Sequence, residues 1–401
     1  MKQVIVFVVL VFCMIFSLSA TTYKVVSQTA EINETLGLGK YQTVVQAGHN
    51  ELNRFTLHRV VKLDKHLKPL PVSRLKGAFM LLPGGGSNFD IYMLGPDGSS
   101  LATFLALKGI DVYGYSPRSN GIVSGYCDSH DCSPMANWGI ATYLEDIEYL
   151  RKQIARVHFS RPVVGGLSLG AILSIAAVNE KPNAYAGAVF WDGTLYYNSP
   201  IQEMFTETCA GFQSLLESGQ YYDNQSYTFL KATTSLYRFD PEGASPFAPG
   251  FSNREFYLYM LTTPNDPPVA EAPGYTYAAG NMSEGLFYVD EDLLFRFAMQ
   301  MNDYEPIALI RDYICGFAGA RTFTNKLAKF KAPIFSLQAG LGFGVYAEDN
   351  LAFFKNADIT RLLLPNFGHA DIGAPKNYEN IICKPIWYWL KDNILPVWER
   401  E

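Results

Sequence analysis

Residues 162–179 read PVVGGLSLGAILSIAAVN. The apolar run before Gly166 predicts a short buried strand, and the small residues after Gly170 predict a helix. Ser168 would then stand on a tight turn between them, with its hydroxyl pushed out at the carboxyl edge of a sheet. Glycines are needed on both sides because side chains there would clash with the neighbouring strand and helix. The stretch predicts a nucleophilic Ser168, and the alternative is an ordinary turn with a buried serine.

Strand and helix patterns alternate on both sides of this stretch. Strands are expected at 41–45, 55–63, 77–82, 109–113, 162–165, 185–191, 332–338 and 359–364. Helices are expected at 101–108, 138–157, 171–179, 349–355 and 381–394. Alternation of this kind predicts an α/β fold with a mostly parallel sheet and helices on both faces.

The alternation stops over residues 196–325, which are rich in turns, Phe and Tyr. We interpret this segment as an insertion in one sheet, so that residues 21–195 form the first part of a core and residues 326–401 the second. Two interpretations of its aromatic side chains remain open. They form a lid over an apolar substrate site, or they fill the core that an insertion of this length needs.

A base for Ser168 is expected in Gly368-His369-Ala370-Asp371, which follows the strand at 359–364. A hydroxyl needs a base to become a nucleophile, and imidazole is suited to this near neutral pH. The sequence has six histidines, and only His369 follows the final strand at the edge that faces the serine turn. A solvated loop histidine is the alternative interpretation.

The strand at 77–82 ends in Pro83-Gly84-Gly85-Gly86. Acyl transfer creates an oxyanion that backbone N–H groups must meet, and a glycine loop lets the backbone approach closely. We expect the N–H groups of Gly85 and Leu169 to form this oxyanion hole. No Lys-Ser, Lys-Thr or GxGxxG pattern accompanies the loop, so a nucleotide site is not expected. A purely structural turn is the alternative.

Together, the PGGG loop, the GLSLG turn and the late GHAD resemble the α/β-hydrolase superfamily. The resemblance covers the chain from about residue 41 onward, apart from the insertion. It implies an eight-stranded, mostly parallel sheet and a catalytic triad in the order Ser, acid, His. It also implies a cap domain between strands six and seven, where residues 196–325 fall.

The acid departs from the pattern of many family members, in which it follows strand seven. Phe343 stands where that Asp is expected. We favour Asp192, which ends strand six before Gly193, a position that some lipase-like members use. Glu348 and Asp349, at the start of the next expected helix, are the alternative acids. A carboxylate is needed to hold the histidine tautomer and stabilise imidazolium.

The first residues resemble an export signal, with Lys2, an apolar run from Val4 to Phe16, and small residues ending at Ala20. We expect a secreted or extracytoplasmic protein with residues 1–20 as signal peptide, or a membrane anchor if they remain uncleaved. Export permits disulfides. Cys127 and Cys132 are the natural pair, and a metal site at Cys127, His130 and Cys132 is the weaker alternative. With a net charge of −6 and no dense basic block, nucleic-acid binding is not expected.

The sequence thus predicts a serine hydrolase of the esterase or lipase kind, which acts on a small-molecule or lipid-like ester without cofactor or metal. The aromatic insertion favours an apolar substrate part. Two other functions remain open. One is acyl transfer to an alcohol on the same scaffold, and the other is a binding protein that kept the fold without catalysis.

Overall fold

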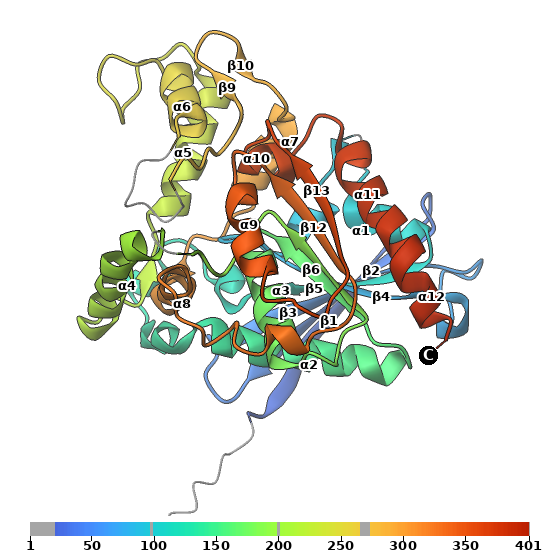
Figure 1. The fold of residues 1–401 in the computed structure, drawn as a ribbon. Helices are drawn as coiled ribbons and strands as arrows, with labels where there is room; N and C mark the ends of the chain where they lie inside the picture. The colour runs from blue at the N-terminus through green and yellow to red at the C-terminus, as the bar shows by residue number, and fades with distance from the viewer. Residues whose placement is uncertain (1–20, 97–98, 199–200, 265–272, 401) are drawn as a thin grey trace, which may run out of the picture.

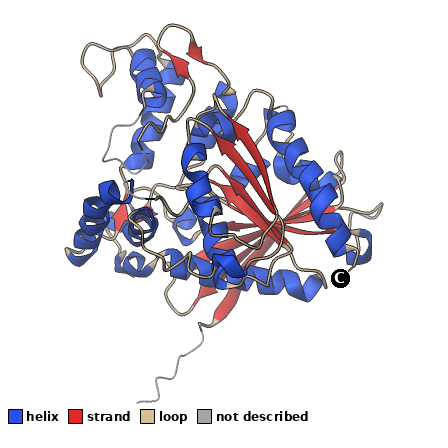
Figure 2. Cartoon of the chain, viewed as in Figure 1, coloured by secondary structure: helices blue, strands red, loops and turns tan. Residues whose placement is uncertain are grey.

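The computed structural model describes residues 21–96, 99–198, 201–264 and 273–400, and their strands form one large sheet through the middle of the molecule (Figure 2). The strand order across the sheet is β1-β2-β3-β5-β4-β6-β7-β12-β13. The strand bounds are β1 Tyr23–Asn33, β2 Leu38–Ala47, β3 Arg54–Lys62, β4 Gly77–Leu82, β5 Ile110–Ser116, β6 Val163–Leu167, β7 Gly187–Trp191, β12 Ile334–Ala339 and β13 Ile359–Leu364. The predicted α/β fold with a mostly parallel sheet is confirmed.

The six strands from β5 to β13 run parallel to one another, whereas β1, β2 and β3 pair antiparallel at one edge. The sheet has nine strands and not the eight that the family resemblance implied. The additional strand is β1, in a part of the sequence where we expected no strand. Ten of its 11 residues are exposed, and hydrogen bonds to β2 hold it in place. Because its side chains are exposed, its sequence has no apolar pattern that would indicate a strand.

Helices cover both faces of the sheet (Figure 1). One face packs against α2, α3 and α9, and the other packs against α1, α11 and α12. The helix bounds are α1 Leu101–Leu107, α2 Ile140–Val157, α3 Leu169–Glu180, α9 Gly344–Leu351, α10 His369–Gly373, α11 Lys384–Trp389 and α12 Leu395–Trp398. Because side chains alternate along a strand, Phe79 enters one core and Met80 enters the other. Central strands are therefore apolar on both faces, which is why they were found from sequence.

The inserted segment lies between β7 and β12 and adds helices above and beside the carboxyl ends of the parallel strands (Figure 1). Its helices are α4 Ile201–Glu217, α5 Ser226–Phe239, α6 Asn253–Thr262, α7 Glu291–Met299 and α8 Ile307–Phe317. Two pairs of short strands complete it, β8 Tyr222–Asp223 with β11 Glu305–Pro306 and β9 Gly280–Asn281 with β10 Gly285–Leu286. An isolated bridge joins Val289 to Pro375. Whether this segment is a separate cap domain remains a prediction.

Two disulfides occur in the described part of the chain. Cys127 bonds to Cys132, the pair expected from spacing, so these thiols are not metal ligands. Cys209 of α4 bonds to Cys315 of α8, a pair that the sequence did not indicate, and Cys383 is a buried free thiol.

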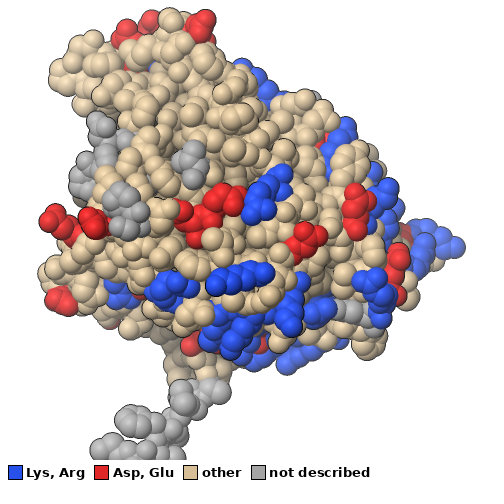
Figure 3. Space-filling view, in the orientation of Figure 1, with Lys and Arg blue, Asp and Glu red and all other residues tan. Residues whose placement is uncertain are grey.

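Charged side chains are unevenly spread over the face shown in Figure 3. Lys and Arg gather over its lower half, whereas the inserted helices above carry few charges. Among the described residues, no helix is both long and apolar enough to cross a bilayer. The predicted signal or anchor at residues 1–20 lies outside the described residues.

Candidate active site

Ser168 stands between the end of β6 and the first residue of α3. Its backbone is in the left-handed region, with φ 58° and ψ −120°, which is strained for a residue with a side chain. The Ser168 N–H donates to the Trp191 carbonyl at 2.8 Å, which fixes the turn against the end of β7. A Cβ on Gly166 or Gly170 would lie 2.1 or 2.0 Å from the Leu82 carbonyl oxygen. Only glycine fits these positions, which is the reason that the GLSLG pattern indicated this turn.

Asp192 follows the neighbouring strand β7 and is fully buried. Its Oδ2 lies 2.6 Å from His369 Nδ1, and its Oδ1 accepts the Ala339 N–H at 2.9 Å. The Asp192 N–H donates to Leu337, so two bonds to β12 hold this residue at a φ of 43°. Because an ionised carboxylate only accepts, the His369 ring donates from Nδ1 and its Nε2 is left as the acceptor. His369 begins α10 and is 8% exposed.

Three aromatic rings surround the His369 imidazole. The ring centroids of Tyr275, Tyr277 and Phe343 lie 5.6, 5.8 and 5.4 Å from that of His369. Tyr275 and Tyr277 come from the inserted segment, whereas Phe343 follows β12. Packing on several sides restricts rotation of the imidazole about its side-chain bonds, which keeps Nδ1 on Asp192.

The loop that carries His369 is held by Asp371 and by the inserted segment. The buried Asp371 Oδ2 accepts the N–H groups of Gly368 at 2.6 Å and Ala279 at 2.7 Å. Burial raises the pKa of this carboxyl to about 6. The Ala370 N–H donates to the Tyr277 carbonyl at 2.5 Å. Sequence reasoning quoted Asp371 within GHAD but gave it no role, although an acid three residues after a glycine is a signal of a capped helix start.

The glycine loop after β4 lies beside Ser168. A Cβ on Gly85 would be 4.0 Å from the Leu169 Cβ, so the two residues expected to form the oxyanion hole are neighbours. Leu169 begins α3, and the first N–H groups of a helix have no acceptor within it. The next residue, Gly86, is held on both sides by the inserted segment. Its N–H donates to Glu305 Oε2 at 2.9 Å, and its carbonyl accepts the Asn302 N–H at 2.5 Å.

Tyr92 is a further residue that sequence reasoning missed. Its buried hydroxyl donates to the Leu82 carbonyl at 2.5 Å and accepts the Leu167 N–H at 2.9 Å. It therefore ties the end of β4 to the end of β6, one residue before Ser168. A tyrosine in a loop carries no pattern that would reveal this bond.

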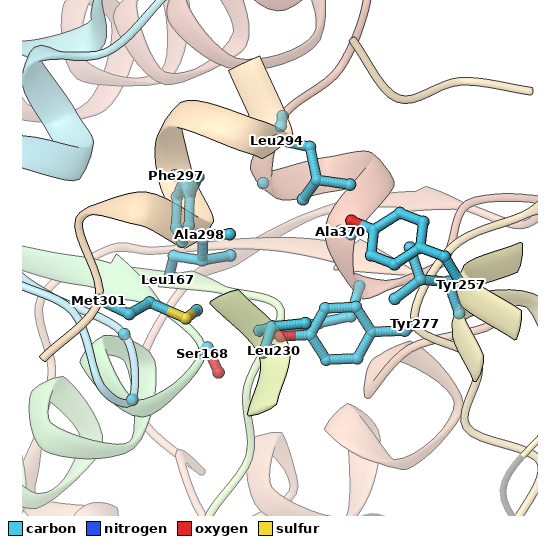
Figure 4. A pocket seen from close by; sticks show the side chains of 16 residues that line it. Leu167, Ser168, Leu230, Tyr257, Tyr277, Leu294, Phe297, Ala298, Met301 and Ala370 are labelled. Carbon is cyan, nitrogen blue, oxygen red and sulfur yellow. The ribbon is translucent and has the colours of Figure 1, made fainter. Parts of the chain in front are cut away.

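Two cavities meet at Ser168 and His369, and both are lined by these two residues and by Gly85. The narrow cavity, of about 50 Å³, is lined mainly by apolar side chains from α5, α6, α7 and α10 (Figure 4). Figure 4 shows Leu294, Phe297 and Met301 around it, with Ser168 at its base. The wide cavity, of about 430 Å³, also contains polar side chains and has the size of a small-molecule site.

Neither a protein-family model nor a curated protein matches the sequence. A solved structure of a candidate lipase from Sulfolobus solfataricus is similar over 92% of this chain and 99% of that one, at 18% identity and a TM-score of 0.63. The chain has the α/β-hydrolase fold. A thioesterase domain from the curacin biosynthetic pathway covers 90% of this chain and 99% of its own, at 11% identity and a TM-score of 0.47.

Within the α/β-hydrolase fold, the two alternative acids lie away from the histidine. Asp349 Oδ1 accepts from the Asn198 side chain at 2.6 Å, and Glu348 is exposed and paired with Arg361 at 2.6 Å. Neither carboxylate is bonded to His369, whereas Asp192 is. The position after β12 holds the Phe343 ring against the imidazole, so this hydrolase-fold chain has an aromatic contact where many members have the acid.

No group of three or more His, Cys, Asp or Glu side chains that would suit a metal ion occurs in the described part of this α/β-hydrolase fold. His130 stacks on Tyr126 with ring centroids 4.1 Å apart, and the neighbouring cysteines are oxidised. The weaker alternative of a metal site at Cys127, His130 and Cys132 therefore does not hold, and the favoured disulfide is the one observed.

Proposed function

We propose that this protein is a serine hydrolase that cleaves carboxylic esters. The observation that carries the proposal is the 2.6 Å contact of His369 Nδ1 with buried Asp192, at a cavity that Ser168 and His369 both line. In this assignment Ser168 is the nucleophile, His369 the base and Asp192 the acid. Residues 21–195 and 326–401 form the catalytic core, and residues 196–325 are its cap.

The reaction proceeds in two halves. His369 Nε2 takes the Ser168 proton as Oγ attacks the ester carbonyl, and Asp192 stabilises the imidazolium that forms. The Gly85 and Leu169 N–H groups donate to the oxyanion, where the start of α3 also favours negative charge. His369 then protonates the leaving alcohol as its C–O bond breaks. Water, deprotonated by His369, attacks the acyl-enzyme and releases the acid and Ser168.

The narrow cavity supports a substrate with an apolar part, because its lining consists mainly of Leu, Phe, Met, Ala and Tyr side chains. We also propose that the protein acts outside the cytoplasm, on the basis of the apolar N-terminal run and the two disulfides.

Labelling with a fluorophosphonate probe tests the assignment. We expect the wild-type protein to react covalently, with the adduct mapped to Ser168 by mass spectrometry, and Ser168→Ala to show no labelling. Ser174→Ala is a matched control, because Ser174 is buried in α3 and its hydroxyl bonds to Gly170. Equal labelling of wild type and Ser168→Ala, or none of either, would reject a catalytic Ser168 and favour a binding protein.

A further inference from the structure

The two cavities that meet at Ser168 differ in charge as well as in width. Among the residues that the structure describes, no Asp, Glu, Lys or Arg lines the narrow cavity. The wide cavity is lined by Asp223 and Glu305 but, within the described residues, by no Lys or Arg. A substrate that bridges the two would place an apolar part in one cavity and a polar part in the other.

Glu305 is the carboxyl of the wide cavity that contacts the glycine loop. It is 4% exposed, lines the wide cavity and accepts the Gly86 N–H at 2.9 Å through Oε2. Glu305 is therefore one residue removed from the proposed oxyanion donor Gly85. A side chain in this place both holds the glycine loop and faces the bound substrate.

Asp223 adds a second carboxyl directly opposite. In the β8–β11 pair, Glu305 is in register with Asp223, although the two are far apart in sequence. Like charges directly across an antiparallel pair destabilise it. Asp223 is fixed by the N–H groups of Gln225 and Ser226 and by the Ser226 hydroxyl, at the start of α5. Burial raises the pKa of Glu305 to about 8, opposed by the Gly86 N–H and aided by Asp223.

Aromatic side chains complete the lining of the wide cavity, among them Tyr227, Tyr313 and Phe317. Ring faces attract cations and tolerate uncharged groups, and hydroxyls exchange hydrogen bonds with a carboxyl group. An anionic group would lose its hydration here and meet the Asp223 and Glu305 carboxyls, of which Glu305 is ionised above about pH 8, with no Lys or Arg among the described residues of the lining.

We propose that the wide cavity receives the alcohol part of the ester and selects uncharged hydroxyl-bearing or cationic alcohols over anionic ones, with Glu305 as the specificity-determining residue. This inference rests on the proposed ester hydrolysis. The substrate class is then an ester of an apolar acid with a polar alcohol that carries no negative charge.

Three octanoyl esters that differ in permanent charge test the selection, and all measurements, calorimetry included, are made at pH 9, above the Glu305 pKa of about 8. Their alcohols are 1,3-propanediol, choline and 3-hydroxypropane-1-sulfonate. At low ionic strength and pH 9, where Glu305 with its pKa of about 8 is ionised, we expect kcat/KM for the neutral and choline esters to exceed that for the sulfonate ester by about tenfold or more, mainly through KM. In Glu305→Gln, which keeps an acceptor for the Gly86 N–H, the ratio of kcat/KM between the other two esters and the sulfonate ester should fall severalfold. Glu242 is an exposed residue of the inserted segment, and Glu242→Gln should leave this ratio unchanged.

Equal kcat/KM for the three esters, or a gap unaltered in Glu305→Gln, would overturn the proposal. Binding to Ser168→Ala separates it from the catalytic assignment. Calorimetry should detect octyltrimethylammonium binding at least tenfold tighter than octyl sulfonate, whether or not Ser168 is catalytic. Selective binding without ester hydrolysis would reject the proposed function and support the charge selection. Ester hydrolysis without charge selectivity would support the proposed function and reject the charge selection.

Discussion

The turn at Ser168 and the inserted residues 196–325 line the same cavities but are held in place by different contacts. The turn is fixed by its own sequence and by the strands beside it, through Gly166, Gly170 and the bond from Ser168 to Trp191. The inserted segment is fixed by contacts to distant parts of the chain. Residues 276–279 bond to the loop of His369, and residues 302–305 bond to the glycine loop.

The groups that we propose to react therefore belong to one region, and many of the groups that surround them belong to the other. The proposed nucleophile, acid and base all come from the ends of parallel strands of the core. The inserted segment supplies most of the apolar lining, the acidic lining and two of the three rings around His369. A change in the core should therefore remove catalysis, whereas a change in the inserted segment should alter stability or selectivity.

The largest expected effect comes from Asp192→Asn in the core. The amide would turn a donor toward His369 or Ala339 and disturb the tautomer that the carboxylate fixes. We expect kcat/KM to fall by roughly 10⁴-fold. Asp349→Asn, the matched change outside the site, should cost less than about threefold. Steady-state hydrolysis of a chromogenic ester measures both, and similar losses in the two variants would contradict the role of Asp192.

Removal of each disulfide tests how much it contributes to the free energy of unfolding in its region. Cys209–Cys315 closes a loop with a sequence separation of 106, whereas Cys127–Cys132 closes one of 5. Loop-closure entropy predicts a loss of about 4–5 kcal/mol for the Cys209→Ser and Cys315→Ser pair and about 2 kcal/mol for the Cys127→Ser and Cys132→Ser pair. Urea unfolding measures both. Equal losses would show that the inserted segment does not depend on its disulfide in this way.

A smaller, pH-dependent effect is expected at Glu305. Its folded pKa of about 8 lies above the ordinary value of 4.5, so the folded state binds more protons between these limits. Stability therefore falls as pH rises from about 4.5 to about 8 and levels off above. Asp223 faces this carboxyl, and the pKa values of Tyr143 and Tyr227 are raised by burial and then by Glu305.

The glutamine of Glu305→Gln does not titrate. The free energy of unfolding of this variant, relative to that of the wild type, should therefore rise by about 1–3 kcal/mol between pH 5 and pH 8. The gain is less than the full pKa shift implies because the carboxyl lines a cavity that is large enough for water. Thermal unfolding at several pH values measures it, with Glu242→Gln as control. Parallel pH curves for wild type and Glu305→Gln would mean that Glu305 is not a buried titrating group.

Sequence reasoning succeeded where the structural cause is local. The strands β4 and β13 have the predicted bounds, because each is a short run rich in apolar residues that ends at a proline. The strand β1 was missed because its side chains are exposed and its stability comes from pairing with β2. Glu305, Tyr92 and Asp371 were missed as site residues because each acts through a bond to a residue that is distant or hidden in a loop.

Local sequence patterns were enough to predict the alternation of strands and helices, the tight turn at Ser168 and the place of His369 after the last strand. These follow from periodicity and from glycines that no larger residue can replace. The tertiary structure was needed to see that, of the three carboxylates, Asp192 contacts His369 while Glu348 and Asp349 pair elsewhere. The tertiary structure was also needed to see which residues surround the serine. Residues 196–325 fold against loops far away in sequence, and such contacts cannot be predicted from a local pattern.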